Sequence, residues 1–199
     1  TTVLALTVGL VCGCAQAERA PAKGAAVTYD EAVALLGSDS TMCRGAAALA
    51  KLDDARALLP LGEAYRRRSE GSKQCLIEAL GAIGRVDRIT VAYAKATPTE
   101  RATLLVVGYL SPSDELLPLA EQGLADGNAD VRWQARRMIS NWKNTPAWRG
   151  VVCRALSSAD KQTRAKALEL LERIRSAEVD AALAAQAARE DDPSLQKRF

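Results

Sequence analysis

The residue types that most often perform acid–base and nucleophilic chemistry are sparse in this chain. Its 199 residues include no histidine, which is the commonest general base and metal ligand in proteins. Adjacent carboxylates occur at Asp53–Asp54, Asp114–Glu115 and Asp191–Asp192, but neighbouring side chains on a helix point in different directions. We interpret these acids as helix-start residues, which interact favourably with the helix dipole, and we expect no enzymatic activity and no cofactor.

One acidic segment resembles the start of a calcium-binding loop. Asp126, Asn128 and Asp130 have the spacing of the first three ligands of such a loop. The sixth position, however, holds Val131 instead of glycine, and the twelfth holds Arg137 instead of glutamate. We therefore interpret this segment as a turn between helices and predict no metal site.

The elements that would position any functional residue follow a repeat. An apolar template, two apolar residues spaced three apart, recurs five times at intervals of about 30 residues. Its copies are Leu49 with Leu52, Leu80 with Ile83, Val107 with Leu110, Ile139 with Trp142, and Leu171 with Ile174. A second apolar set follows each copy, so each period contains two short amphipathic helices. Such helices bury their apolar faces by stacking on the next pair, which predicts an all-α solenoid.

Helix-start signals divide the periods into paired helices. Thr97–Glu100 combines a capping hydroxyl, a proline at the first helical position and an acid at the third. Ser111–Pro112, Thr145–Pro146 and Ser176 are expected to begin the second helices of the third, fourth and fifth copies. We expect the tail, residues 189–199, to be charged, broken by a proline and frayed.

Residues 40–188 resemble the HEAT-repeat family, including the HEAT-like repeats of phycobilin lyases. The matching residues are Asp130, Val131, Arg132 and Ala135 in a first helix, and Leu58–Leu61 and Leu116–Leu119 in second helices. The resemblance implies a right-handed α-solenoid of about five antiparallel helix pairs within residues 29–188, with Tyr29–Leu36 as an N-terminal capping helix. It implies little about activity, because the family includes scaffolds, adaptors, assembly factors and a few enzymes.

The first 17 residues carry no charge and resemble the apolar part of an export signal. Two processing sites are plausible from the residues. Ala15–Ala17 has the form that signal peptidase cleaves, whereas Val11–Cys14 resembles a lipobox in which Cys14 would be lipidated. We expect an exported, periplasmic protein anchored through Cys14, with a soluble exported protein as the alternative. Residues 18–28 would form a flexible tether.

Three further cysteines raise the question of a disulfide. Cys43 and Cys75 lie at nearly equivalent positions of adjacent repeats. Their Cα atoms would be about 10 Å apart in an ideal stack, which exceeds the distance that a disulfide tolerates, although a small stagger could shorten it. A disulfide and two separately buried thiols therefore both remain open, and we expect Cys153 to be buried.

One surface feature suggests a binding role. Trp133, Arg136 and Arg137 lie off the apolar stripe of their expected helix, and an aromatic side chain beside arginines is typical of an interaction hot spot. Alternatively, Trp133 would fill a groove between neighbouring repeats and would not contact a partner. The HEAT-repeat resemblance implies that the second helices line a concave face that a protein partner would contact. The candidate contact residues on these helices are Tyr65, Arg66, Tyr93, Arg149 and Arg154.

These observations favour a non-enzymatic protein-binding scaffold of the bacterial cell envelope. The alternative is a nucleic-acid-binding protein that resembles the HEAT-like DNA glycosylases, with Trp133, Arg132, Arg136, Arg137, Trp148 and Arg149 as the analogous residues. A bilin lyase or chaperone is a third class that rests on the family resemblance alone. DNA repair is cytoplasmic, whereas the first 17 residues resemble an export signal. The formal net charge is also only +3. Both observations argue against a nucleic-acid partner.

Overall fold

The structure is a computed structural model that describes residues 27–69 and 73–199. These residues form α-helices and short 3-10 helices, without a strand in the described part. The helices are α1 (Tyr29–Leu35), α2 (Met42–Leu52), η1 (Ala55–Ala57), α3 (Leu58–Arg67), α4 (Gln74–Ile83), α5 (Val86–Lys95), α6 (Pro98–Leu110), η3 (Asp114–Leu116), α7 (Leu117–Leu124), α8 (Ala129–Ser140), α9 (Pro146–Ala155), α10 (Lys161–Leu171), α11 (Ala177–Ala187) and α12 (Pro193–Gln196). The all-α prediction is confirmed. The expected signal, Cys14 and most of the tether lie outside the described residues.

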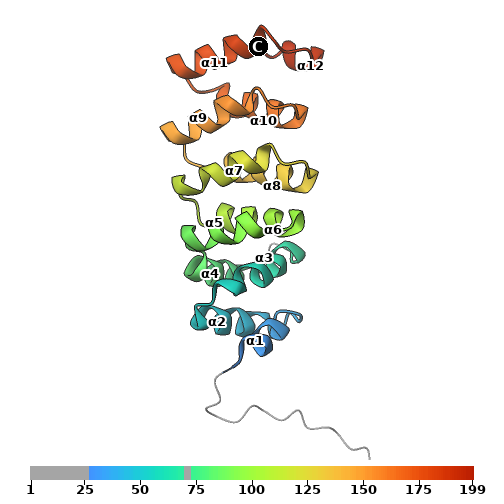
Figure 1. The fold of residues 1–199 in the computed structure, drawn as a ribbon, viewed down its shortest axis with the longest axis vertical. Coiled ribbons are helices and arrows are strands. Elements are labelled where there is room, and N and C mark those ends of the chain that lie inside the picture. The colour runs from blue at the N-terminus through green and yellow to red at the C-terminus, as the bar shows by residue number, and fades with distance from the viewer. Residues whose placement is uncertain (1–26, 70–72) are drawn as a thin grey trace, which may run out of the picture.

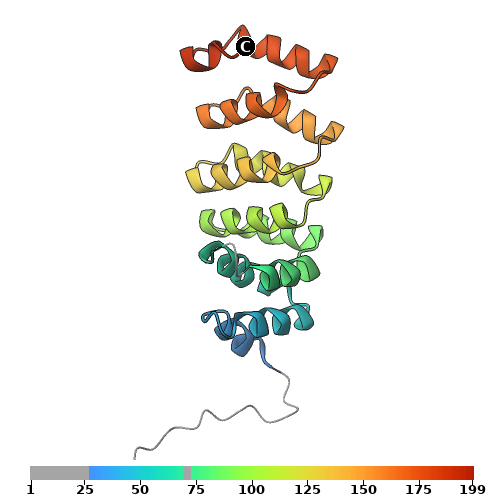
Figure 2. The same cartoon turned by 180° about the vertical axis from the view of Figure 1, so that it is seen from behind.

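The helices stack in layers along one long axis, and each layer contains two consecutive helices (Figures 1 and 2). Close packing joins α1 to α2, α3 to α4, α5 to α6, α7 to α8, and α9 to α10, while α11 and α12 form the last layer (Figure 1). Successive layers meet through pairs such as α2 with α4, α6 with α8, and α7 with α9. None of the helices in this part of the chain has the length and apolar character that a bilayer-spanning segment needs.

The phase of this pairing differs from the sequence-based prediction. We expected α2 to pair with α3, α4 with α5, and so on, but among those pairs only α6 and α7 are in close contact. The repeat period in the sequence predicts two helices per repeat. It does not indicate whether a helix pairs with the helix before it or with the helix after it. Glycines mark two of the observed pairs. A Cβ on Gly45 of α2 would lie 2.7 Å from the Ala32 carbonyl oxygen of α1, and a Cβ on Gly123 of α7 would lie 2.9 Å from Ala135 Cβ of α8.

The apolar template lines the core, although not completely. Its first member is fully buried in all five copies: Leu49, Leu80, Val107, Ile139 and Leu171. Leu52, the second member of the first copy, is 42% exposed because it is the last residue of α2. The expectation that Leu52 lies in the core was therefore wrong. In the template, the first position is always buried, whereas the burial of the second position differs between copies.

Most of the helix-start signals are confirmed by hydrogen bonds. The Thr97 hydroxyl accepts from the Glu100 amide, and the Glu100 carboxylate accepts from the Thr97 amide, which completes the capping box of α6. Thr145 caps α9 and Ser176 caps α11 in the expected way. Ser111 instead ends α6, and the 3-10 turn η3 separates it from α7.

The C-terminal tail contains a short helix, α12, where we expected fraying. Asp192 caps α12, so Pro193 occupies the first helical position, where proline is tolerated, and does not break the helix. Leu195 is buried, and Glu190 accepts two hydrogen bonds from Arg164 of α10. The prediction failed because these tertiary contacts are invisible in the local composition of the tail.

A disulfide joins the first two layers. Cys43 of α2 and Cys75 of α4 have Cα atoms 5.3 Å apart, about half the separation that we assumed for equivalent positions. The approach is closer because α2 and α4 pack directly against each other. Cys153 of α9 is free and partly buried, and burial raises the pKa of its thiol, with Glu178 contributing in the same direction.

Replacing both Cys43 and Cys75 with serine is expected to lower the free energy of unfolding by about 3 kcal/mol, because the disulfide restricts the unfolded chain. Denaturant unfolding of the oxidised protein and the double variant would measure the difference. A Cys153→Ser variant is the control and should stay close to wild type. Peptide mapping after thiol alkylation would contradict the disulfide if both cysteines were alkylated without a reductant.

Candidate docking surface

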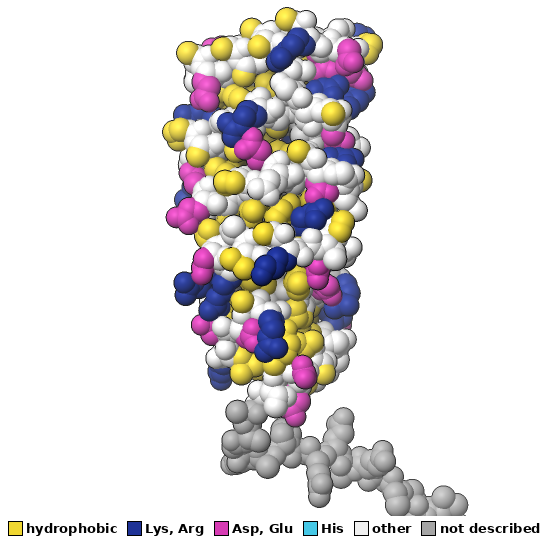
Figure 3. Space-filling model, in the orientation of Figure 1, with side chains coloured by type: hydrophobic (Ala, Val, Ile, Leu, Met, Phe, Trp, Pro, Cys, Tyr) yellow, Lys and Arg dark blue, Asp and Glu magenta, His cyan; other side chains and the backbone are white. Residues whose placement is uncertain are grey.

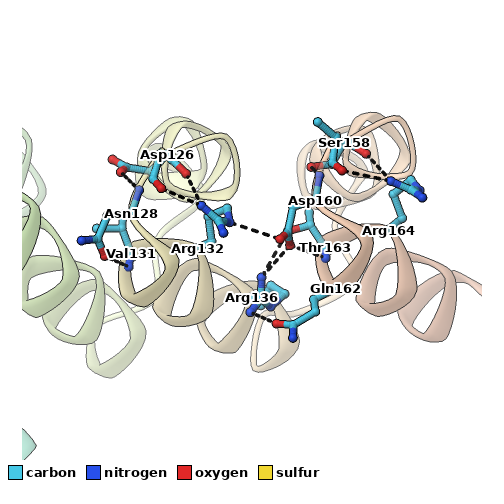
Figure 4. Close-up of polar contacts among 12 residues, drawn as sticks. Asp126, Asn128, Val131, Arg132, Arg136, Ser158, Asp160, Gln162, Thr163 and Arg164 are labelled. Carbon is cyan, nitrogen blue, oxygen red and sulfur yellow. Dashed lines mark hydrogen bonds and ion pairs between the residues drawn. The ribbon is translucent and has the colours of Figure 1, made fainter.

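A ladder of arginines and acids connects successive layers, and sequence inspection missed it. Figure 4 shows the part of this ladder around Asp160. Arg101, Arg132 and Arg164 occupy equivalent positions near the starts of α6, α8 and α10. Each donates to a backbone carbonyl of the turn before its own helix and pairs with an acid of the following turn. The carbonyl oxygens belong to Ala96, to Asp126 and Gly127, and to Ser158 and Ala159; the acids are Asp126, Asp160 and Glu190. Arginine recurs here at the repeat interval, and this recurrence in the sequence could have indicated the ladder.

Arg136 belongs to this ladder and is largely buried, although it also contributes to the lining of the groove beside Trp133. It is only 8% exposed, and its Nη1 lies 2.9 Å from Asp160 Oδ2 while its Nη2 donates to Gln162 Oε1 at 2.8 Å (Figure 4). Burial lowers the pKa of its guanidinium, and the Asp160 charge partly offsets this effect. The expectation that Arg136 is a surface residue was wrong, because Arg136 lies one turn after Arg132 and faces the start of α10.

Both tyrosines proposed for partner contact are buried as well. Tyr65 of α3 and Tyr93 of α5 are 6% and 4% exposed. The Lys73 ammonium lies 4.4 Å from the centre of the Tyr65 ring. Burial, together with the nearby Asp126 charge, raises the pKa of Tyr93 to about 12. Both side chains belong to the hydrophobic core. The tyrosines of α3 and α5, two helices that we expected to line a binding face, are therefore not available for partner contact.

The remaining candidates on the second helices already have partners within the chain. Arg66 binds Asp130 Oδ2 at 2.6 Å and the Thr103 hydroxyl at 2.9 Å, and thereby links separate layers. Arg154 is exposed and pairs with Glu121 at 2.5 Å. Arg149 donates to the Asn144 side chain at 2.9 Å. These contacts explain the positions of the three arginines without an external ligand.

Trp133 and Arg137 of α8 form an aromatic and cationic cluster at the surface, together with Tyr109 of α6. Trp133 is 47% exposed, and the Arg137 guanidinium carbon lies 4.9 Å from the centre of the Trp133 ring and 5.1 Å from that of Tyr109. A groove of about 310 Å³ at this cluster extends to Lys166 of α10. We call Tyr109, Trp133, Arg137 and Lys166 the Trp133 surface. Sequence inspection found two of its four members.

Two other grooves have different characters. One of about 560 Å³ lies along the ends of α7 and α9, where its polar lining includes the ladder residues Asp126, Arg132 and Asp160. The other, of about 380 Å³, lies between α3 and α5 and includes Val91, which is 61% exposed. Among these three grooves, only the one at the Trp133 surface has aromatic side chains in its lining beside arginine, the composition typical of binding hot spots.

The ladder makes the last layer sensitive to acid. Hydrogen bonds from Arg164 lower the pKa of Glu190 to about 2, against the opposing effect of its burial. A carboxyl whose pKa is lower in the folded state stabilises the fold above its unfolded pKa, and this contribution disappears as the pH falls through the folded pKa. Thermal midpoints of wild type and Glu190→Gln should therefore differ most above about pH 5 and converge towards pH 2. A constant difference across this range would contradict the assigned role.

No protein-family model matches the chain, and a search among curated proteins finds no match. The resemblance to HEAT repeats therefore rests on the residues given above, and the function is proposed below from the geometry of the surface.

Proposed function

We propose that the chain is a HEAT-like, right-handed α-solenoid that acts as a non-enzymatic protein-binding scaffold. The proposal rests mainly on the Trp133 surface, where a half-exposed tryptophan, a tyrosine and an arginine lie in contact beside a groove. Tryptophan, tyrosine and arginine are the residues that contribute most to binding free energy at protein interfaces. A stack of short helices supports this role, because it offers an extended surface on a rigid frame.

We further propose that the scaffold is exported to the bacterial cell envelope and anchored there through lipidated Cys14. The apolar, uncharged first 17 residues support this location. The disulfide between Cys43 and Cys75 gives independent support, because such bonds persist in oxidising compartments and are rare in the cytosol.

We favour a protein partner over nucleic acid because of where the arginines lie. Of the residues that would correspond to a DNA glycosylase site, Arg132 and Arg136 pair with Asp160, and Trp148 is buried. Figure 3 shows acidic and basic side chains interspersed along the visible face, in place of a basic track. Nucleic-acid backbones are bound by concentrated positive charge, which the face shown in Figure 3 does not offer.

Replacing Trp133 with alanine is expected to reduce recovery of a bound partner at least tenfold when the tagged full-length protein is isolated from its native cells, because hot-spot residues dominate binding. Quantitative mass spectrometry of the co-purifying proteins would measure this. Val91→Ala removes another exposed apolar side chain, on α5, and is the matched control. Equal losses in both variants, or a loss in neither, would contradict a binding role for Trp133.

A further inference from the structure

We infer that the Trp133 surface recognises an acidic, partly apolar segment of its partner protein, and that Arg137 binds a carboxylate of that segment. The inference rests on the proposed function, since it names the chemistry of the partner that this surface would bind. Three observations carry it: the charge state of the groove, the position of Arg137 and the aromatic side chains around it.

Arg137 is a cation whose charge the fold does not neutralise. Within residues 27–69 and 73–199 no carboxylate lies within ion-pair distance of its guanidinium, and its one side-chain hydrogen bond reaches Gln134 Oε1 at 3.4 Å. The neighbouring Arg136, by contrast, pairs with Asp160, which it shares with Arg132. Two adjacent arginines on α8 thus serve different purposes, and Arg137 retains donors for an external acceptor.

The guanidinium of Arg137 is also held in place before any partner binds. It contacts the rings of Trp133 and Tyr109, whose centres lie within 5.1 Å of its central carbon. A free arginine side chain loses much rotational entropy when it binds, and these contacts reduce that loss. A planar guanidinium that is fixed in this way suits a carboxylate, which it can bind through two parallel hydrogen bonds.

The groove around Arg137 has the charge and polarity for an acidic segment. Its lining contains no carboxylate. Besides Arg137 it holds two further cations, each with an acid outside the lining: Arg136 pairs with Asp160, and Lys166 of α10 pairs with the exposed Glu169. The half-exposed Trp133 and the partly buried Tyr109 provide apolar area next to the cations. An acidic side chain with an apolar or aromatic neighbour would complement both features at once.

A peptide pair tests this chemistry directly. One fluorescein-labelled twelve-residue peptide alternates glutamate with leucine and phenylalanine, and the other has glutamine at each glutamate position. Fluorescence anisotropy with the full-length protein should show at least tenfold tighter binding of the glutamate peptide. Arg137→Gln should remove most of that preference, whereas Arg149→Gln, which changes an arginine on α9 that donates to Asn144, should retain it.

Several results would overturn the inference. Equal affinities for the two peptides, equal effects of the two arginine variants, or no measurable binding of the glutamate peptide would each do so. Arg137-dependent binding of an oligothymidylate of the same length, without binding of the glutamate peptide, would assign the surface to phosphates instead. The co-purification experiment is independent of peptide charge, so a Trp133-dependent partner could still be found if the carboxylate inference failed.

Discussion

Replacing Asp160 with asparagine is expected to lower the free energy of unfolding by about 4 kcal/mol, one of the two largest effects that we predict. Asp160 accepts hydrogen bonds from the Thr163 amide and hydroxyl at 2.8 Å, and its carboxylate pairs with Arg136 and Arg132 (Figure 4). Asparagine would leave two largely buried guanidinium groups without a counter-charge. Urea unfolding followed by circular dichroism would measure the change.

Asp87→Asn is the matched control for this substitution. Asp87 also pairs with an arginine, but both side chains of the Arg85–Asp87 pair are about two-thirds exposed, so water replaces the lost contact. We expect a change below about 0.5 kcal/mol in the control. Similar effects of the two substitutions would show that the ladder is a surface network of little consequence.

The pH dependence of wild type provides a second test of the ladder at Asp160. Burial alone would raise the pKa of its carboxyl, but the hydrogen bonds from Thr163 and the charges of Arg136 and Arg132 outweigh burial and lower it. The resulting stabilisation is complete above the unfolded pKa of about 4 and is lost as the pH falls below it. The deficit of Asp160→Asn relative to wild type should therefore shrink in acid.

Replacing Leu104 with alanine is the second large effect that we expect, at about 4 kcal/mol of destabilisation. Leu104 is fully buried in α6, where every residue from Ala102 to Gly108 is buried. This helix packs against α3, α5 and α8, so the surroundings cannot collapse easily into the cavity left by the smaller side chain. The same urea unfolding experiment would measure the loss.

Leu52→Ala makes the same chemical change at the end of α2, where the leucine is 42% exposed. We expect this variant to lose less than about 1 kcal/mol, because much of its side chain already contacts water. The comparison separates burial from residue type. Equal losses at the two positions would contradict the layered arrangement that places α6 at the centre.

The helices themselves could be predicted because their signals are local. Thr97, Thr145 and Ser176 mark helix starts through side chains that reach only three residues along the chain. The first template residue of each copy was also correctly assigned to the core. The pairing of helices was not predictable in this way, because it depends on close approaches such as that of Gly45 to α1.

The candidate site was only partly predictable for a related reason. Trp133 and Arg137 were found from their position off the apolar stripe of one helix. Arg136 met the same criterion, and Tyr93 was a candidate because it lies on a second helix, but both side chains are buried. Tyr109 was missed because its contact with Arg137 joins α6 to α8, and no pattern within either helix indicates that contact. Burial by a neighbouring layer depends on how the helices stack, so the pattern within a single helix does not predict it.

The most direct test of the central claim, that the Trp133 surface binds a protein, is photocrosslinking in living cells. The full-length protein would carry benzoylphenylalanine at position 133 in one strain and at position 91, on α5, in another. We predict a discrete crosslinked protein from position 133 that is absent from position 91 and is lost when Arg137→Gln is combined with the probe. No crosslinked protein from position 133, or the same set from both positions, would contradict the account.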